Sequence, residues 1–174
     1  MNLCVAAYPE LSPDDYARIQ AFRKRNDAYY RVVEPHFTLI FPTDEWEVVP
    51  FIAEVRKQSA GFPAFDFCIR GAALNRDISG DYFHALLVPD EGHSQFLKLR
   101  YKLCVDRFFS YRALEVDFIP HMGVGNSKDR LRCLRMVESW NVADFAIPGR
   151  ISCMDVANYE NDTVETIQRI PLTQ

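Results

Sequence analysis

The stretch Pro35-His36-Phe37-Thr38-Leu39-Ile40 has a counterpart downstream in Pro120-His121-Met122-Gly123-Val124-Gly125. In each, the residue before the proline is steered toward extended backbone, and most of the following residue types are common in strands. Residues two apart in a strand share a face. We therefore predict that His36 and Thr38 point the same way, that His121 and Gly123 do so too, and that the alternate residues turn to the opposite face.

Length and composition indicate an ordinary globular chain. It has 174 residues, of which 48% are apolar and 25% charged, with a net charge of -4. This predicts one domain over residues 1–174, or one domain built of two halves, with a substantial core. The order of elements described below makes those halves two pseudo-symmetric lobes. Proteins that grip long nucleic acid usually carry a basic excess, so the net charge argues against a long nucleic acid as partner, whereas a small phosphorylated ligand or a nucleic-acid end is compatible with it.

The cysteines and the first seven residues indicate the cellular compartment that we expect for the protein. The five cysteines are scattered and form no CxxC pair, which predicts reduced, buried thiols and no metal cluster. Residues 1–7 lack a basic region and are too short an apolar run for a signal peptide. No stretch approaches a membrane span. We therefore expect a cytoplasmic protein with no membrane partner, and a monomer.

The two histidine stretches occupy the same place in a repeated order of elements. Each half of the chain is predicted to run strand, helix, histidine strand, helix, strand, with one extra strand at the end. Ser12-Pro13-Asp14-Asp15 starts the first helix, and Asn126 or Ser127 is expected to cap the last one. The two histidine strands are predicted at 32–41 and 118–124, and 160–162 should close a hairpin. Two such halves related by a pseudo-two-fold axis would bring both histidines into one cleft.

Two histidines on opposite sides of a phosphodiester can divide proton transfer between them. Histidine has an unperturbed pKa of about 6.5, so it can take or give a proton near neutral pH. One neutral imidazole would deprotonate the attacking water or hydroxyl, and the other, protonated, would donate to the leaving oxygen. A hydroxyl beside each histidine would hold the non-bridging phosphate oxygens. Such a site requires no metal and no cofactor.

His36-Phe37-Thr38-Leu39, followed by His121-Met122-Gly123-Val124, resembles the 2H phosphoesterase superfamily, in particular its 2'-5' RNA ligase-like (LigT-like) and cyclic phosphodiesterase branch. That family has two H-x-[T/S] motifs on paired central strands. The resemblance implies a duplicated, bilobal α+β fold with two antiparallel sheets facing a central cleft and helices outside. It also implies a metal-independent hydrolase acting on 2',3'-cyclic phosphate or 2'-5' phosphodiester bonds of nucleotides or RNA ends, with 2'-5' RNA ligase activity as a further option.

The family pattern transfers to three positions and departs at a fourth. The resemblance implies that His36 and His121 are the catalytic histidines and that Thr38 contacts the phosphate. Gly123 occupies the slot of the second hydroxyl and brings no side-chain donor, which could cost about 3 kcal/mol of transition-state stabilisation. Glycine also lets backbone or water approach closely. The alternative function is therefore a catalytically weakened nucleotide- or RNA-end-binding protein of the same fold.

The remaining candidates have plainer interpretations. His84 is predicted to be structural and His93 to lie at a helix start, although either could join a metal site. Tyr8 could stack on a base. The basic residues near the second motif face either solvent or phosphate: Arg100, Lys102, Arg107, Arg130, Arg132 and Arg135. An unrelated α+β domain with structural histidines is the third option, and the pseudo-symmetry leaves open which histidine is acid and which is base.

Overall fold

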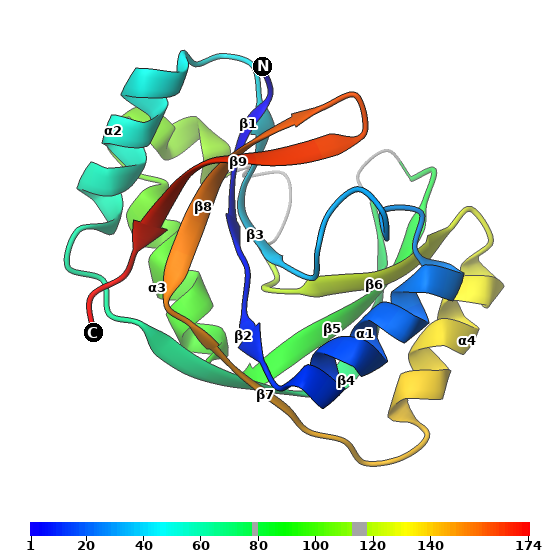
Figure 1. Cartoon of the computed structure of the whole chain (residues 1–174). Helices are drawn as coiled ribbons and strands as arrows, with labels where there is room; N and C mark the ends of the chain where they lie inside the picture. The colour runs from blue at the N-terminus through cyan, green and yellow to red at the C-terminus, as the bar shows by residue number, and fades with distance from the viewer. Residues whose placement is uncertain (78–79, 113–117) are drawn as a thin grey trace.

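Two antiparallel sheets form the framework of the computed structural model, which describes residues 1–77, 80–112 and 118–174 (Figure 1). The four-stranded sheet has the order β3-β1-β8-β9, with bounds Phe37–Thr43, Leu3–Ala7, Cys153–Glu160 and Thr163–Pro171. The five-stranded sheet has the order β2-β7-β4-β5-β6, with bounds Glu10–Leu11, Ile147–Ile151, Phe65–Arg76, Phe83–Glu91 and Met122–Ser127. The predicted α+β class with two antiparallel sheets is confirmed.

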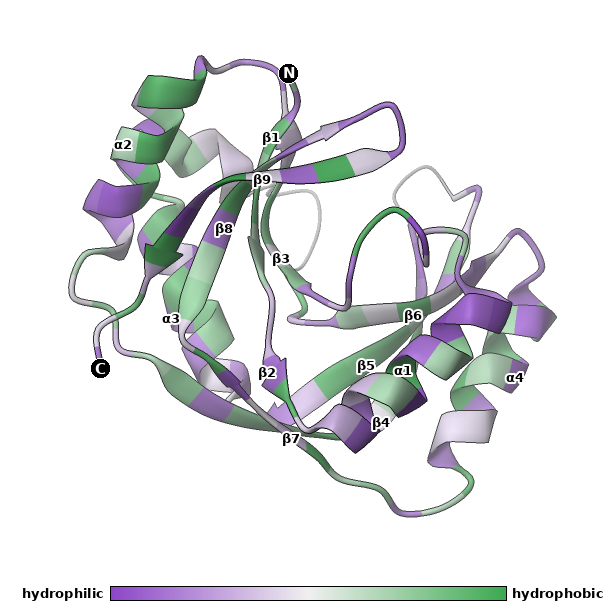
Figure 2. Cartoon of the chain, viewed as in Figure 1, coloured by the Kyte–Doolittle hydropathy of each residue, from purple (hydrophilic) through white to green (hydrophobic). Residues whose placement is uncertain are grey.

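The helices of the described residues lie outside the sheets (Figure 1). They are α1 Pro13–Asn26, α2 Val48–Ser59, α3 His93–Leu103 and α4 Arg130–Asn141, and a short 3-10 segment covers Asp106–Arg112. Helices α1 and α4 pack on the five-stranded sheet, whereas α2 packs on α3, which contacts β3 and β5. Figure 2 shows hydrophobic and hydrophilic bands along α2, as expected for a helix with one buried side. No helix in the described part of the chain is long and apolar enough to cross a membrane.

The two halves of the sequence exchange strands. Strands β3 and β1 come from the first half and pair with β8 from the second. Strands β6 and β5 come from the second half and pair with β4 from the first. The predicted order of elements is present with two strands that were not predicted, β2 and β7, and each sheet contains strands from both halves. The arrangements β3-β1-β8 and β6-β5-β4 correspond to each other.

Both histidine strands begin later than predicted. Strand β3 starts at Phe37 and β6 at Met122, so His36 and His121 are each the residue directly before a strand. The segment before His36 forms a turn instead of a strand: the N–H groups of Val32 and Val33 donate to the Tyr29 carbonyl, and Arg23 donates to the Val33 carbonyl. Both strands are also edge strands of their sheets, rather than central ones.

Local signals in the sequence define several element ends. The Ser12 hydroxyl accepts a hydrogen bond from the backbone N–H of Asp15 and caps α1, as predicted. The hairpin between β8 and β9 is also confirmed, because Asn161 and Asp162 have φ values of 52° and 54°, as a tight hairpin turn requires. The cap of α4 was placed too early: Asp129 caps this helix.

The core lies between the sheets and the helices. Phe37 packs against Phe67 and Phe96, with ring centroids 5.2 and 4.2 Å away. Phe37 and Leu39 are each 1% exposed, so the alternation predicted for the first histidine stretch is confirmed. All five cysteines are free thiols; four are buried, and Cys153 is half-buried.

Candidate active site

The two histidines are held by the same local hydrogen bond. In each, Nδ1 lies next to the backbone carbonyl oxygen two residues earlier: Glu34 for His36, at 2.8 Å, and Ile119 for His121, at 2.7 Å. A carbonyl oxygen can only accept, so Nδ1 carries the proton in both rings. The Nε2 atoms then hold the lone pair of the neutral imidazoles. Each histidine is thereby oriented to exchange a proton through Nε2.

A cavity of about 320 Å³ lies between the two sheets beside these histidines. His36 and Thr38 line it from the side of the four-stranded sheet, and Gly123 and Asn126 line it from the five-stranded sheet. His121 is adjacent to this lining, close enough that its charge lowers the pKa of His36. The structure thus brings three of the four predicted site residues to one cavity and places the fourth next to it.

The Gly123 position is open. A Cβ atom built on Gly123 meets nothing within 4 Å, so a threonine or serine would fit without displacing a neighbour. By contrast, a Cβ on Gly125 would come within 2.7 Å of Met136 Sδ. Gly123 is therefore not required by packing, and the missing hydroxyl leaves space in the cavity wall.

Both imidazoles favour the neutral form. Burial lowers the pKa of His36, and the charges of Arg23 and His121 lower it further, against the opposing effects of the Glu34 carbonyl and Asp27. Burial also lowers the pKa of His121, with a smaller contribution from the charge of His84, while the hydrogen bond to Ile119 opposes the shift. An anionic ligand in the cavity would shift both in the opposite direction.

A buried arginine on α1 holds the segment that carries His36. Arg23 is 2% exposed, and its guanidinium donates to the carbonyl of Val33 at 2.8 Å and to the Asp27 carboxylate at 2.8 Å. Asn126 on β6 donates to the same carboxylate at 2.9 Å. This network joins the segment before His36 to the strand that follows His121, and it uses the Asn126 side chain that had been predicted as a helix cap.

A second buried arginine joins the strand that follows His36 to the 3-10 segment after α3. Arg100 on α3 is 3% exposed and donates to the carbonyls of Leu39 and Tyr111. Its guanidinium also lies 5.2 Å from the centre of the Phe118 ring. Arg23 and Arg100 each stand three residues before the end of the helix that precedes a histidine strand. Arg23 comes four residues after the buried Ile19, and Arg100 comes four residues after the buried Phe96. Residues four apart share one face of a helix, and this spacing is the sequence signal for the burial of both arginines.

Other basic candidates lie away from the cavity. Arg130, Arg132 and Arg135 are carried by α4, outside the cavity lining. Lys102 donates to the carbonyl of Ala60, and Arg107 stacks on Trp46 at 4.3 Å. His93 is the first residue of α3, also outside the lining. Within the described residues, no group of three or more His, Cys, Asp or Glu side chains is placed to hold a metal ion.

His84 is the site residue that sequence reasoning missed. It lies on β5 and lines the cavity together with His36 and Gly123. The only sequence signal was strand parity, because Tyr82, His84 and Leu86 alternate, and no companion motif accompanied it. The cavity mouth also carries exposed aromatic rings, with Tyr29 46% and Phe41 54% exposed.

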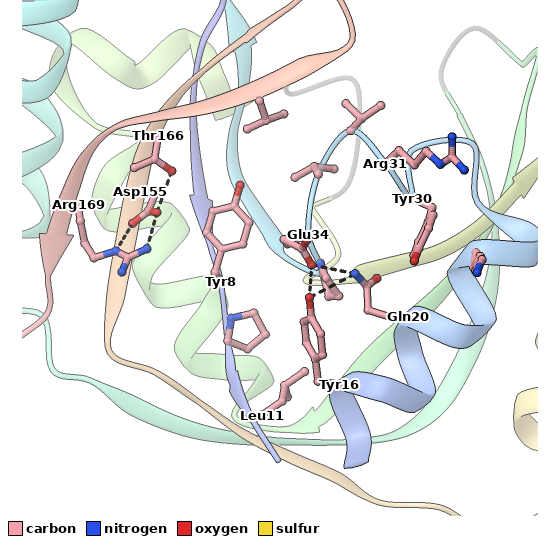
Figure 3. A pocket seen from close by; sticks show the side chains of 16 residues that line it. Tyr8, Leu11, Tyr16, Gln20, Tyr30, Arg31, Glu34, Asp155, Thr166 and Arg169 are labelled. Atoms are coloured by element: carbon pink, nitrogen blue, oxygen red, sulfur yellow. Dashed lines mark hydrogen bonds and ion pairs between the residues drawn. The ribbon is translucent and has the colours of Figure 1, made fainter. Parts of the chain in front are cut away.

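A larger groove of about 880 Å³ adjoins the cavity at Tyr8, which lines both (Figure 3). Figure 3 shows Tyr8 between the Asp155–Arg169 ion pair, 2.9 Å, and the Glu34 carboxylate, to which the Tyr16 hydroxyl donates. Burial raises the pKa of Tyr8 to about 12, so its phenol stays protonated. Its ring centre is 5.9 Å from that of His36. The groove also has Lys24 and Arg31 in its lining.

Comparison with known proteins identifies structures with the same fold and a matching family model. The crystal structure of TT0787 of Thermus thermophilus matches with a TM-score of 0.62 and 14% identity over 99% of this chain and 98% of that one. Escherichia coli LigT complexed with 3'-AMP gives 0.60 and 14%, and LigT complexed with phosphate gives 0.57 and 12%, each over 99% of this chain and 98% of that one. No curated protein sequence matches. The model of the 2'-5' RNA ligase superfamily matches residues 10–163, and the chain therefore belongs to that family.

Proposed function

We propose that this protein is a metal-independent phosphodiesterase that uses His36 and His121 as general base and general acid. The substrates are 2',3'-cyclic phosphate or 2'-5' phosphodiester bonds of nucleotides or RNA ends. The observation that carries the proposal is the matched pair of Nδ1–carbonyl hydrogen bonds, which leaves both Nε2 atoms available beside one cavity. The free thiols favour a cytoplasmic location.

The chemistry follows from the two protonation states. One neutral imidazole accepts a proton from the attacking water at Nε2 as the new P–O bond forms. The bond between phosphorus and the leaving oxygen breaks, and the other imidazole, protonated, gives its Nε2 proton to that oxygen. Thr38 donates its hydroxyl to a non-bridging oxygen and holds the phosphorus in line. Exchange of protons with solvent then restores the starting states.

The surroundings of the cavity favour an RNA end over a free phosphate as the ligand. Tyr29, Phe41 and Tyr8 offer aromatic faces on which a base can stack. The adjoining groove offers Lys24 and Arg31 for phosphates beyond the reacting one. That E. coli LigT has been solved with 3'-AMP supports a nucleotide as the ligand.

The open Gly123 position favours a second candidate function. A site with one hydroxyl instead of two holds the phosphate less tightly in the transition state. The alternative is a protein that binds nucleotides or RNA ends in the same cavity with little turnover.

Hydrolysis of the four 2',3'-cyclic mononucleotides by EDTA-treated protein tests the proposal. A dinucleotide that ends in the same cyclic phosphate is measured beside them. His36→Ala and His121→Ala should each lower turnover by about 10²–10⁴-fold, because each removes one proton-transfer group. His93→Ala is the matched control and should leave the rate unchanged, since His93 lies outside the cavity.

The outcomes separate the two functions. Turnover that survives EDTA and falls in both variants supports the enzyme. Turnover that is indifferent to both substitutions contradicts the two-histidine mechanism. If the wild-type protein binds the nucleotides without turning over any substrate, the binding function is the correct one.

A further inference from the structure

His84 lies where it can replace what Gly123 lacks. In the pairing of β5 with β6, Leu86 stands opposite Gly123 and His84 stands opposite Asn126. His84 is therefore two residues along β5 from the residue that faces Gly123. The register shifts between Ala85 and Leu86, so Gly123 lies three residues from Asn126 on β6, whereas Leu86 lies two residues from His84 on β5. His84, Gly123 and Asn126 all line the same cavity.

The space above Gly123 is available to a ligand. No atom lies within 4 Å of a Cβ built there, so the wall of the cavity is indented at that position. The opposite wall carries Thr38 and His36. A phosphate held between the walls has a hydroxyl donor on the Thr38 side and, at Gly123, a recess instead of a donor.

The His84 imidazole is free to serve such a ligand. It is half-buried, and within the described residues it makes no hydrogen bond to another side chain or to the backbone. It lies close enough to His121 for its charge to lower the pKa of that residue. An imidazole carries at least one N–H donor in every protonation state it adopts at neutral or acidic pH.

We propose that His84 donates a hydrogen bond to a non-bridging oxygen of the bound phosphate, on the His121 side and in place of the hydroxyl that Gly123 lacks. This inference rests on the proposed function for its role in turnover. The contact itself requires only that the cavity binds phosphate. The two phosphate donors of the site are then Thr38 on one wall and His84 on the other.

A set of four variants tests the role in turnover: His84→Ala, His84→Gln, Gly123→Thr and the double variant His84→Ala/Gly123→Thr. With 2',3'-cyclic AMP and EDTA, His84→Ala should lower kcat about 100-fold, the usual effect of removing one such donor. His84→Gln keeps an N–H donor and should lose less than about tenfold, a loss below that of a full donor. His93→Ala should stay within about twofold of wild type, as expected for a histidine outside the cavity.

The double variant tests whether a hydroxyl at position 123 can replace the phosphate contact of His84. Gly123→Thr should restore kcat at least about tenfold in the His84→Ala background, and should change the wild-type rate less than that, because residues that serve one contact are not additive. A His84→Ala rate within about threefold of wild type overturns the proposal. Equal effects of Gly123→Thr in both backgrounds overturn it too.

Titration with inorganic phosphate, followed by NMR, tests the contact without turnover. The chain has four histidines, so single substitutions assign their imidazole C–H signals. Phosphate should shift the signals of His36, His84 and His121 but not that of His93. Shifts of His36 and His121 without His84 overturn the inference and leave the proposed function standing. Shifts of all three in a protein that hydrolyses no diester leave the contact standing and remove the proposed function.

Discussion

We call residues 34–38 the first histidine arm and residues 119–123 the second. The two arms are alike in backbone and differ in the side chain two residues after the histidine. In both arms, a carbonyl two residues back orients the imidazole. A buried arginine lies on the helix before each arm, but Arg23 and Arg100 both bind carbonyls next to His36 in the chain, those of Val33 and Leu39. The first arm then places Thr38 two residues after its histidine. The second arm has Gly123 in that position, with empty space around it.

This difference separates orientation from phosphate contact. Orientation of each imidazole at Nδ1 uses a main-chain carbonyl and no side-chain partner. Phosphate contact through a hydroxyl depends on one residue and is lost when that residue is glycine. In the proposed mechanism, the second arm therefore keeps an imidazole for proton transfer but has no hydroxyl for the phosphate.

The largest expected effect distinguishes the two arginines. Arg23→Met leaves the Asp27 carboxylate, 6% exposed, without its charged partner, and should lower the free energy of unfolding by about 3–5 kcal/mol. Arg100 has no acidic partner among the described residues, so Arg100→Met removes a buried charge as well as two carbonyl contacts and should cost about 1–3 kcal/mol.

Urea unfolding at pH 7 measures both losses. Arg25→Met is the control, because Arg25 is exposed on the same helix as Arg23 and should change stability by about 0.5 kcal/mol or less. Equal losses for Arg23→Met and Arg100→Met would mean that leaving the Asp27 carboxylate without its charged partner costs nothing beyond the lost carbonyl contacts.

The second largest expected effect is the loss of activity in Thr38→Ala. This substitution removes the hydroxyl of the first arm, which the second arm lacks. Thr38→Ala should lower kcat by about 10²–10³-fold, since it removes the hydroxyl donor on that wall of the cavity. Thr38→Ser keeps the hydroxyl and should retain most of the activity. Thr163→Ala, at an exposed position in the β8–β9 hairpin, is the control. Steady-state hydrolysis of a 2',3'-cyclic mononucleotide gives these values, and a loss below threefold for Thr38→Ala would remove Thr38 from the site.

Features set by neighbouring residues were predictable from the sequence. The alternation of Phe37, Thr38 and Leu39, the Ser12 cap and the turn at Asn161 depend on contacts within a few residues. The order of elements followed from the same local signals, and the family resemblance supplied the two facing sheets.

Features set by distant residues were not predictable in the same way. Strand β8 of the second half pairs with β1, and β4 of the first half pairs with β5. These pairings join residues far apart in the chain, so local sequence patterns do not predict them. Asn126 looked like a helix cap because its partner, Asp27, is 99 residues away. His84 looked structural because only the fold brings it beside Gly123 and His121.

The smallest effect is the pH dependence, in which the two arms act together. The base must be neutral and the acid protonated, so activity is confined between their two pKa values. Burial lowers the pKa of both His36 and His121 from the ordinary value of about 6.5. In the free protein, both are then mostly neutral at pH 7, and the missing species is the protonated acid.

The bell-shaped profile of kcat/KM should therefore have its maximum below pH 6.5, and kcat/KM should fall about tenfold per pH unit on the alkaline side, which corresponds to about 1.4 kcal/mol. The profile of kcat reports the complex, in which the phosphate charge raises both pKa values, so its maximum should lie at higher pH. Rates from about pH 4.5 to 8.5 cover both profiles. A kcat/KM maximum above pH 7 would mean that burial does not control the two imidazoles, and coincident maxima would mean that the substrate phosphate does not sit between the two arms.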